Sequence, residues 1–315
     1  MNFKTTFLKF IFIVSLSLTT LFAKAQSPDP NTTVLCAGET RTLTSTITGT
    51  TYQWYKDNIL ITGATSRTYD ALGANPGASY TVVAINANGC ASDASDPILV
   101  VNAPVATPVI TIANNSSCQT ATNEVVLTGS GVPTAGVPTG LTYAFEWKKV
   151  GSATVLGTGT TLTLKDVAES GQYTLTLTPV WKTKNLNCAG TSTASTVTIY
   201  PFAAKATILP VISGYQTADE ERAGMVCEFN TVTFTTAVSP GPNTTISGLT
   251  YQWYKDGIAI SGETATTLVL TNVGTTNSGN YTVKTKTANN CEATSDASIL
   301  DVKTRLSKPT ITFAD

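Results

Sequence analysis

The sequence predicts an all-β chain of tandem antiparallel β-sandwiches, on three observations. Threonine accounts for 60 of the 315 residues, and its β-branched side chain suits a pleated sheet better than a helix. The string Thr51–Asp57 recurs unchanged at Thr250–Asp256. The order Cys, Trp, Tyr, Cys occurs three times, which indicates repeated folding units rather than one large domain.

The N-terminal segment, Met1–Ala25, has the pattern of a secretory signal peptide. Lys4 and Lys9 form a short basic region, an apolar run follows to about Phe22, and Ala23–Ala25 matches the A-x-A cleavage pattern. The apolar run is shorter than the roughly 20 residues that cross a membrane. We expect a cleaved signal peptide at residues 1–25, an uncleaved anchor being the alternative. The chain is then secreted or at the cell surface, and meets the membrane only through this segment.

Each repeated unit has one tryptophan followed by one tyrosine at a nearly constant distance. The Trp-to-Tyr spacing is identical in the first two units and only slightly longer in the third. This regularity indicates that the same two strands are built three times. The pairs are Trp54 with Tyr80, Trp147 with Tyr173, and Trp253 with Tyr281.

Short alternating stretches between these landmarks predict strands. In the third unit, Thr231–Thr236 places Val232 and Phe234 on one face, and Leu268–Leu270 alternates in the same way. The dipeptide Asp256-Gly257 is a turn signal between two such stretches. Many short strands without a helical period, in units of about 75 to 100 residues, predict antiparallel β-sandwiches.

The units resemble immunoglobulin-like domains. Gly38-Glu39 followed by Leu43 resembles the start of strand B, Trp54–Asp57 resembles strand C with its turn, and Ser278–Tyr281 resembles the tyrosine corner before strand F. The strings Cys-Ala-Gly-Glu-Thr and Asn-Gly-Cys resemble those of secreted multi-domain surface proteins of Bacteroidetes-type bacteria. The resemblance implies that Trp54, Trp147 and Trp253 fill the cores and that Tyr80, Tyr173 and Tyr281 bond to the backbone.

The repeats place three immunoglobulin-like domains at residues 27–102, 103–201 and 202–303. Lys308–Ala314 resembles Thr107–Ala113, the expected opening strand of the second domain. We therefore interpret residues 304–315 as a tail or as the start of a truncated fourth module.

Six cysteines, an even number in an exported chain, predict disulfides. Each domain has one cysteine before strand B and one after strand F, so pairing within a domain is the simplest hypothesis. Strands B and F run in the same direction, however, which puts these two positions at opposite ends of a sandwich. Bridges between neighbouring domains are therefore the alternative. The pairs within domains are Cys36 with Cys90, Cys118 with Cys188, and Cys227 with Cys291.

The composition excludes several classes of function. With 19 basic and 20 acidic residues, the chain has no excess of basic residues for nucleic acid. It contains no histidine, which removes His-based acid/base triads and most zinc sites. The sequence also has no Gly-rich phosphate loop, no nucleophile elbow and no metal-spaced cysteine cluster. We expect no enzyme activity, no cofactor and no metal.

Trp181 lies outside the repeated pattern. It falls between Tyr173 and Cys188, where the Tyr-to-Cys spacing is longer than in the other two units. On a projecting loop, Trp181 with Lys182 and Lys184 would form a candidate partner-binding site. Alternatively the strand simply runs longer, and Trp181, on the same face as Tyr173, caps the core or packs on the first domain.

These observations predict an exported, non-catalytic tandem immunoglobulin-like protein that acts as a cell-surface adhesion, binding or spacer segment. Its partner would be an unknown protein or glycan at the cell surface. The alternative is an accessory, non-catalytic region of a larger secreted enzyme, for example one that degrades a polysaccharide, with the catalytic domain beyond residue 315.

Overall fold

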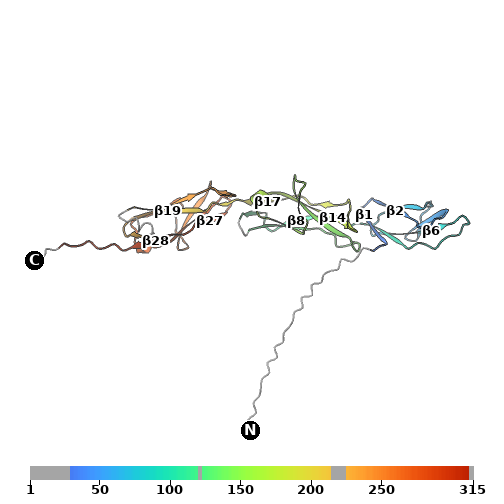
Figure 1. Ribbon diagram of the computed structural model, residues 1–315, viewed down its shortest axis with the longest axis horizontal. Coiled ribbons are helices and arrows are strands. Elements are labelled where there is room, and N and C mark those ends of the chain that lie inside the picture. The colour runs from blue at the N-terminus through green and yellow to red at the C-terminus, as the bar shows by residue number, and fades with distance from the viewer. Residues whose placement is uncertain (1–28, 120–122, 214–224, 312–315) are drawn as a thin grey trace, which may run out of the picture. The chain divides into compact units, whose positions relative to one another are not determined.

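The structure is a computed structural model that describes residues 29–119, 123–213 and 225–311. The predicted signal peptide and residues 312–315 of the expected fourth module lie outside these ranges. The described elements are β-strands and two short 3-10 helices, η1 (Val167–Glu169) and η2 (Thr275–Asn277) (Figure 1). The predicted fold class, tandem antiparallel immunoglobulin-like β-sandwiches, is confirmed.

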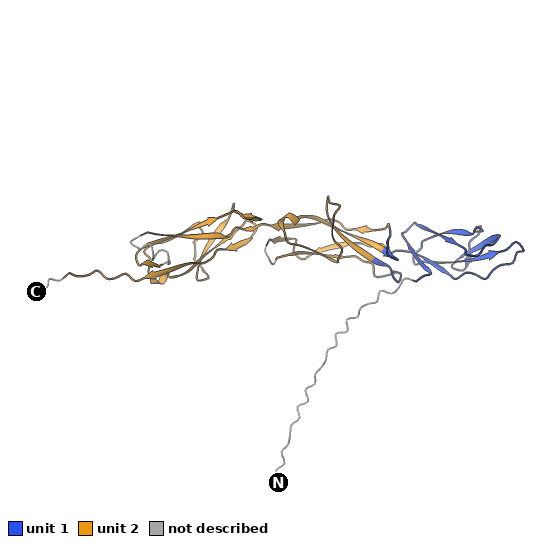
Figure 2. Ribbon diagram, in the orientation of Figure 1, with its two compact units in different colours: residues 1–104, 134–142, 180–186 blue, residues 105–133, 143–179, 187–315 orange. Residues whose placement is uncertain are grey.

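The chain separates into two compact units (Figure 2). Unit 1 holds the residues up to Pro104, together with 134–142 and 180–186. Unit 2 holds the remainder and contains two separate hydrophobic cores. We call the strands β1–β7 sandwich 1, β8–β17 sandwich 2 and β18–β28 sandwich 3.

Sandwich 1 consists of a five-stranded sheet, in the order β1-β7-β6-β3-β4, and a two-stranded sheet, β2-β5. Strands β1 and β7 are parallel, and the other pairs are antiparallel. The strands are β1 (Thr32–Leu35), β2 (Thr40–Thr44), β3 (Thr51–Lys56), β4 (Ile59–Leu60), β5 (Thr68–Leu72), β6 (Ala78–Ile85) and β7 (Ile98–Asn102).

Sandwich 2 has the sheets β12-β11-β14-β17-β9 and β13-β10-β8, with β15 and β16 paired to β14. Its smaller sheet thus contains one more strand than that of sandwich 1. The strands are β8 (Val109–Ile112), β9 (Ser116–Cys118), β10 (Val125–Ser130), β11 (Thr142–Lys149), β12 (Val155–Gly157), β13 (Thr161–Leu164), β14 (Gly171–Trp181), β15 (Lys184–Asn185), β16 (Gly190–Thr191) and β17 (Ser195–Tyr200).

Sandwich 3 repeats this plan, with sheets β20-β28-β26-β23-β24 and β19-β21-β25, β27 on β26, and a small pair β18-β22. The strands are β18 (Phe202–Ala203), β19 (Ala206–Ser213), β20 (Met225–Cys227), β21 (Thr231–Val238), β22 (Thr244–Thr245), β23 (Thr250–Lys255), β24 (Ile258–Ala259), β25 (Thr267–Leu270), β26 (Gly279–Lys286), β27 (Glu292–Thr294) and β28 (Ser298–Lys303).

The three repeated tryptophans lie in the cores, each with the same hydrogen bond. The Nε1–H of each donates to the carbonyl oxygen twelve residues later, at 2.8 to 2.9 Å. A buried indole needs a partner for its single donor, and the following turn supplies it in every sandwich. The acceptors are Ser66 for Trp54, Gly159 for Trp147 and Ala265 for Trp253.

The three repeated tyrosines are buried as well, and each hydroxyl donates to a backbone carbonyl. Tyr281 donates to Asn277 at 2.7 Å, Tyr80 donates to Leu72 at 3.3 Å, and Tyr173 donates to Glu169. In sandwiches 2 and 3 the bonds hold η1 and η2 against β14 and β26, and in sandwich 1 the bond holds the end of β5 against β6.

The core of sandwich 1 differs from the other two. Sandwiches 2 and 3 each have a single continuous cluster of buried side chains around Trp147 and Trp253. Sandwich 1 has two smaller clusters instead, one around Trp54 and one around Tyr80. The partly buried Leu43, Ile61 and Tyr69 pack against both clusters and connect them, so that fewer of its apolar side chains are fully buried.

Candidate functional site

A groove with a volume of about 870 Å³ opens into sandwich 1. It lies between β2 on one side and residues 92–98, which lead into β7, on the other. Trp54, Tyr80 and Val82 contribute to its apolar lining. The groove thus reaches side chains of both buried clusters, Tyr80 in one and Trp54 and Val82 in the other.

The groove exists because one edge of β2 has no partner strand. β2 pairs with β5, and no strand in the described part of the chain pairs with its other edge. In sandwich 2 the equivalent strand β10 lies between β13 and β8, and in sandwich 3 β21 lies between β25 and β19. Among the described residues, sandwich 1 therefore has no counterpart of β8 and β19.

The backbone of β2 offers hydrogen-bonding groups along this open edge. The Ser45 N–H donates to the Arg67 carbonyl on the β5 side, at 3.0 Å. Because these groups alternate along an antiparallel strand, those of Thr42 and Thr44 point away from β5. In sandwich 2 the residue equivalent to Thr44 is Thr128, which lies opposite Thr111 of β8. The open edge can thus accept one more antiparallel strand.

The side chains of β2 also match an incomplete core. Arg41 is exposed and Leu43 is only half-buried, although both point to the inner face with Ser45. At the equivalent positions of β10, Val125 and Leu127 are fully buried. An additional strand beside β2 would cover Leu43 as β8 covers Leu127.

The rest of the groove lining is polar and balanced in charge. Its charged residues are two of each sign, namely Arg41, Lys182, Asp93 and Asp96. Ser92 and Ser95 also line it, and their hydroxyl oxygens accept the backbone N–H groups of Ala84 and Val82 at 3.0 and 3.1 Å. The groove therefore favours an uncharged, extended apolar segment over a strongly charged ligand.

Trp181 does not lie on a free loop. It ends the eleven-residue strand β14, where alternate side chains from Tyr173 to Trp181 are buried, and its own exposure is 6%. The strand continues through the tight turn Lys182-Thr183 into β15. The projecting loop is therefore wrong and the alternative, a longer strand, is confirmed, because the extra residues extend β14 and keep the indole on the buried face of the strand.

The two lysines beside Trp181 have different environments. Lys182 Nζ lies 5.5 Å from the centre of the Trp181 ring and donates to the Thr32 carbonyl of β1 at 3.4 Å. Lys182 thereby becomes part of the groove lining. Lys184 pairs with Trp181 across the hairpin and is exposed. The three residues share one hairpin tip, but only Lys182 takes part in the groove.

Burial perturbs the titration of the core tyrosines. Desolvation, with a smaller effect of Asp256, raises the pKa of Tyr281 to about 12. Desolvation likewise raises the pKa of Tyr80, with Tyr69 and Asp57 adding to the effect. These hydroxyls are neutral hydrogen-bond donors at physiological pH, so Tyr80 contributes no ionised base to the groove.

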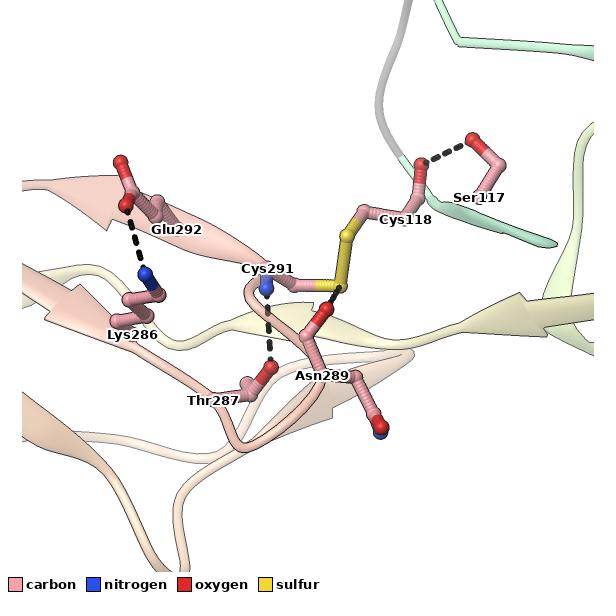
Figure 3. The surroundings of a disulfide bond; sticks show 7 residues. All are labelled: Ser117, Cys118, Lys286, Thr287, Asn289, Cys291 and Glu292. Carbon is pink, nitrogen blue, oxygen red and sulfur yellow. Dashed lines mark hydrogen bonds and ion pairs between the residues drawn. A yellow bond between two sulfur atoms is a disulfide. The ribbon is translucent and has the colours of Figure 1, made fainter. Parts of the chain in front are cut away.

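The cysteines do not pair within the sandwiches as first expected. Cys118, at the end of β9, is bonded to Cys291, in the turn after β26, with an S–S distance of 2.01 Å and a Cα–Cα distance of 5.5 Å (Figure 3). The pairings Cys118–Cys188 and Cys227–Cys291 are therefore wrong, and this bridge joins sandwiches 2 and 3. Within one sandwich the two positions lie at opposite ends, too far apart for a disulfide, whose Cα atoms lie within about 7 Å of each other.

Of the four other cysteines, two are disulfide-bonded and two are free thiols. Cys36 and Cys188 are disulfide-bonded. Cys90 is a free, exposed thiol, and Cys227 is a free thiol that is partly exposed. The expected bond between Cys36 and Cys90 is therefore wrong as well, because Cys90 is reduced.

The geometry of the groove leaves room for an extended peptide beside β2. A free β-edge supplies main-chain hydrogen bonds, and the apolar lining accepts alternate side chains. Among residues 29–119, 123–213 and 225–311, no group of three or more acidic or cysteine side chains is arranged to hold a metal ion. In those same ranges, no helix has the length and apolar character needed to cross a bilayer.

Sequence reasoning missed the groove, although a signal for it was present. Thr107–Ala113 contains β8 and Lys205–Ile212 contains most of β19, whereas the residues described before β1, 29–31, are too few to form a strand.

The comparisons with known proteins agree with this fold. Residues 25–104 match a family model described as an Ig-like domain, CHU_C associated. No curated protein sequence matches the chain. The match covers sandwich 1, the part of the chain that carries the groove.

Several solved structures are similar to this chain. Three N-terminal domains of the bacteriophage RB49 highly immunogenic outer capsid protein share 17% identity, cover 87% of this chain and 96% of that chain, and give a TM-score of 0.34. Murine CEACAM1b shares 15% identity over 62% of this chain and 100% of that chain, with a TM-score of 0.33. Drosophila OTK extracellular domains 3–5 share 15% identity, cover 86% of this chain and 99% of that chain, and give a TM-score of 0.29.

Proposed function

We propose that this protein is an exported, non-catalytic segment that carries mechanical load at the cell surface, as part of an adhesin or as a spacer. The observation that carries the proposal is the Cys118–Cys291 bridge between two sandwiches. Such a bond persists in oxidising compartments, and it prevents the two sandwiches from being pulled apart. The absence of histidine and the low charge density support a structural role over catalysis.

A force measurement tests the load-bearing part of this proposal. The bridge encloses a loop with a sequence separation of 173 residues, which would extend by roughly 600 Å if free. In single-molecule pulling, with Cys36→Ser/Cys188→Ser present in both chains so that no other bridge limits the extension, the oxidised mature chain should unfold with a contour length shorter by about this amount than that of the Cys118→Ser/Cys291→Ser variant. Equal contour lengths for the two chains would contradict the proposal.

A cell experiment tests the location and separates an adhesin from a spacer. Protease added to intact cells should cleave the protein, and a protein protected until lysis would contradict export to the surface. If the segment is a spacer, replacing residues 29–303 by an unrelated array of three immunoglobulin-like domains should preserve the attachment of the cells to a surface that carries the protein or glycan ligand. The same replacement should abolish attachment if the segment itself binds a surface protein or glycan.

A further inference from the structure

We propose that the groove of sandwich 1 receives residues 308–313 of a second copy of this chain, which add a strand to the edge of β2 that no described strand covers, so that copies join head to tail. The occupant is identified by its resemblance to the strands that cover the same edge in sandwiches 2 and 3.

The segment Lys308–Ala314 has the sequence of such a strand. It matches Thr107–Ala113, which contains β8, at Pro309, Ile311, Thr312 and Ala314. Its first residues, Lys-Pro-Thr-Ile, also follow the pattern Lys-Ala-Thr-Ile at Lys205–Ile208, which leads into β19. In the described structure, Ile311 belongs to no strand and is 94% exposed.

The distance from the preceding sandwich is also the same. Ile110 follows the end of β7 by eight residues, and Ile208 follows the end of β17 by eight residues. Ile311 likewise follows the end of β28 by eight residues. The segment from the end of β28 to Ile311 therefore has the same length as the two segments that lead from one sandwich into the first strand of the next within the chain.

The strand register can be transferred residue by residue. Ile110 lies opposite Gly129 in β10, and Ile208 lies opposite Thr236 in β21. The N–H groups of Gly129 and Thr236 donate to the strand on the far side, to Thr160 and Thr266, as the Ser45 N–H donates to Arg67. By this equivalence, Ile311 of the second copy pairs with Ser45, and Phe313 pairs with Leu43. Both apolar side chains then enter the groove.

The free cysteines fit the same arrangement. Cys118 and Cys227 end the equivalent strands β9 and β20, and pair with Tyr200 and Lys303 respectively. Cys90 and Cys291 occupy the same turn: the N–H of Asn86 donates to the Cys90 carbonyl at 3.0 Å, and the N–H of Thr287 donates to the Cys291 carbonyl at 2.9 Å. A junction built like that of sandwiches 2 and 3 brings Cys227 of one copy next to Cys90 of the following copy.

Closure of this bond is an oxidation. The Cys227 and Cys90 thiols form one S–S bond and together lose two protons and two electrons. A small-molecule disulfide such as oxidised glutathione accepts the electrons by exchange and is reduced to two thiols. The strand pairing comes first and holds the two thiols in place, and the bond then makes the junction covalent.

The first experiment measures the mass of the purified mature chain, residues 26–315, by light scattering over a range of concentrations in reducing buffer. We expect oligomers that grow with concentration. Ile311→Asp/Phe313→Asp should weaken association at least tenfold, and Leu306→Asp, an equally exposed apolar residue outside the strand position, should not. A chain that stays monomeric throughout, or assembly unaffected by the double substitution, would overturn the proposal.

The second experiment tests the polarity of the junction through its bond. With oxidised glutathione, the wild-type chain should give a ladder on a non-reducing gel, and Cys90→Ser and Cys227→Ser alone should give none. An equal mixture of these two variants should form a covalent dimer and nothing larger, since only one cysteine of each kind remains. Cys90–Cys90 or Cys227–Cys227 peptides in a digest, or a ladder that persists in Ile311→Asp/Phe313→Asp, would refute the head-to-tail junction.

Discussion

Cys118 and Cys291 are 173 residues apart in the chain, yet their Cα atoms lie 5.5 Å apart. The bridge closes at the junction of sandwiches 2 and 3, where the Asn243 side chain also donates to Asp166 at 3.4 Å. Each of these two contacts joins a residue of sandwich 2 to a residue of sandwich 3. The junction is thus a built interface, stabilised covalently, rather than a loose linker.

Removal of this bridge should lower stability markedly. For a loop of this length, the chain-entropy model gives a contribution of up to ~5 kcal/mol. We expect Cys118→Ser/Cys291→Ser to unfold at a clearly lower denaturant concentration than the wild type, by circular dichroism. Cys90→Ser, which alters a free and exposed thiol, serves as the control and should change the midpoint little. A double variant as stable as this control would show that the bond adds nothing to the folded state.

The indole of Trp253 should be one of the largest single contributors to sandwich 3. It is fully buried, contacts Phe234 at a ring distance of 6.1 Å, and donates to Ala265. Trp253→Ala should cost about 3–5 kcal/mol in the free energy of unfolding. Val269→Ala, on the solvent face of β25, should cost less than about 0.5 kcal/mol. Equal melting temperatures for the two variants would argue against the core position of Trp253.

The open groove predicts unequal costs for the same substitution in sandwiches 1 and 2. Leu127→Ala removes a fully buried side chain from a continuous core and should cost about 2–5 kcal/mol. Leu43→Ala removes a half-buried side chain at the equivalent position and should cost about 1 kcal/mol. Chemical denaturation of both variants in reducing buffer checks this difference. Similar costs would mean that the edge of β2 is covered in solution.

The raised pKa of Tyr281 predicts a loss of stability in alkali. The folded state binds the hydroxyl proton more tightly than the unfolded state, whose pKa is near 10.0. The stabilising contribution is therefore complete below pH 10 and is lost as the pH rises towards 12, by up to ~3 kcal/mol. Tyr281→Phe should be less stable at pH 8 by about 1 kcal/mol, because the bond to Asn277 is missing, and should show a shallower decline above pH 10. An identical decline in both chains would exclude Tyr281 as its source.

The hairpin that follows Trp181 should tolerate a stabilising substitution. Lys182 and Thr183 have φ angles of 46° and 68°, a conformation that suits Asn and Gly in a two-residue hairpin. Relief of the left-handed strain at these two positions should raise the free energy of unfolding of Lys182→Asn/Thr183→Gly by about 1 kcal/mol. Lys184→Asn lies outside the turn and is the matched control. A double variant less stable than this control would indicate that the Lys182 contact with Thr32 outweighs the turn strain.

Much of the fold could be predicted because its signals are local. Trp54, Trp147 and Trp253 have the same neighbours in the chain, and their hydrogen-bond acceptors lie twelve residues later in every sandwich. The alternation that marks β14 or β26 needs no knowledge of distant residues. Strand positions, core aromatic residues and the sandwich class therefore follow from short stretches of sequence.

The disulfide partners and the groove could not be predicted in this way. The choice between Cys188 and Cys291 for Cys118 depends on which turn comes within a few ångström, and spacing along the chain does not encode that distance. The groove lies at an edge of β2, beside Thr44, that no strand of the described residues pairs with, and such an open edge is visible only when the sheets are assembled. The sequence by itself determined the strands and the core aromatic residues of each sandwich. The tertiary structure decided which cysteines join the sandwiches and where an edge of sandwich 1 is open. Both features depend on contacts between segments far apart in the chain.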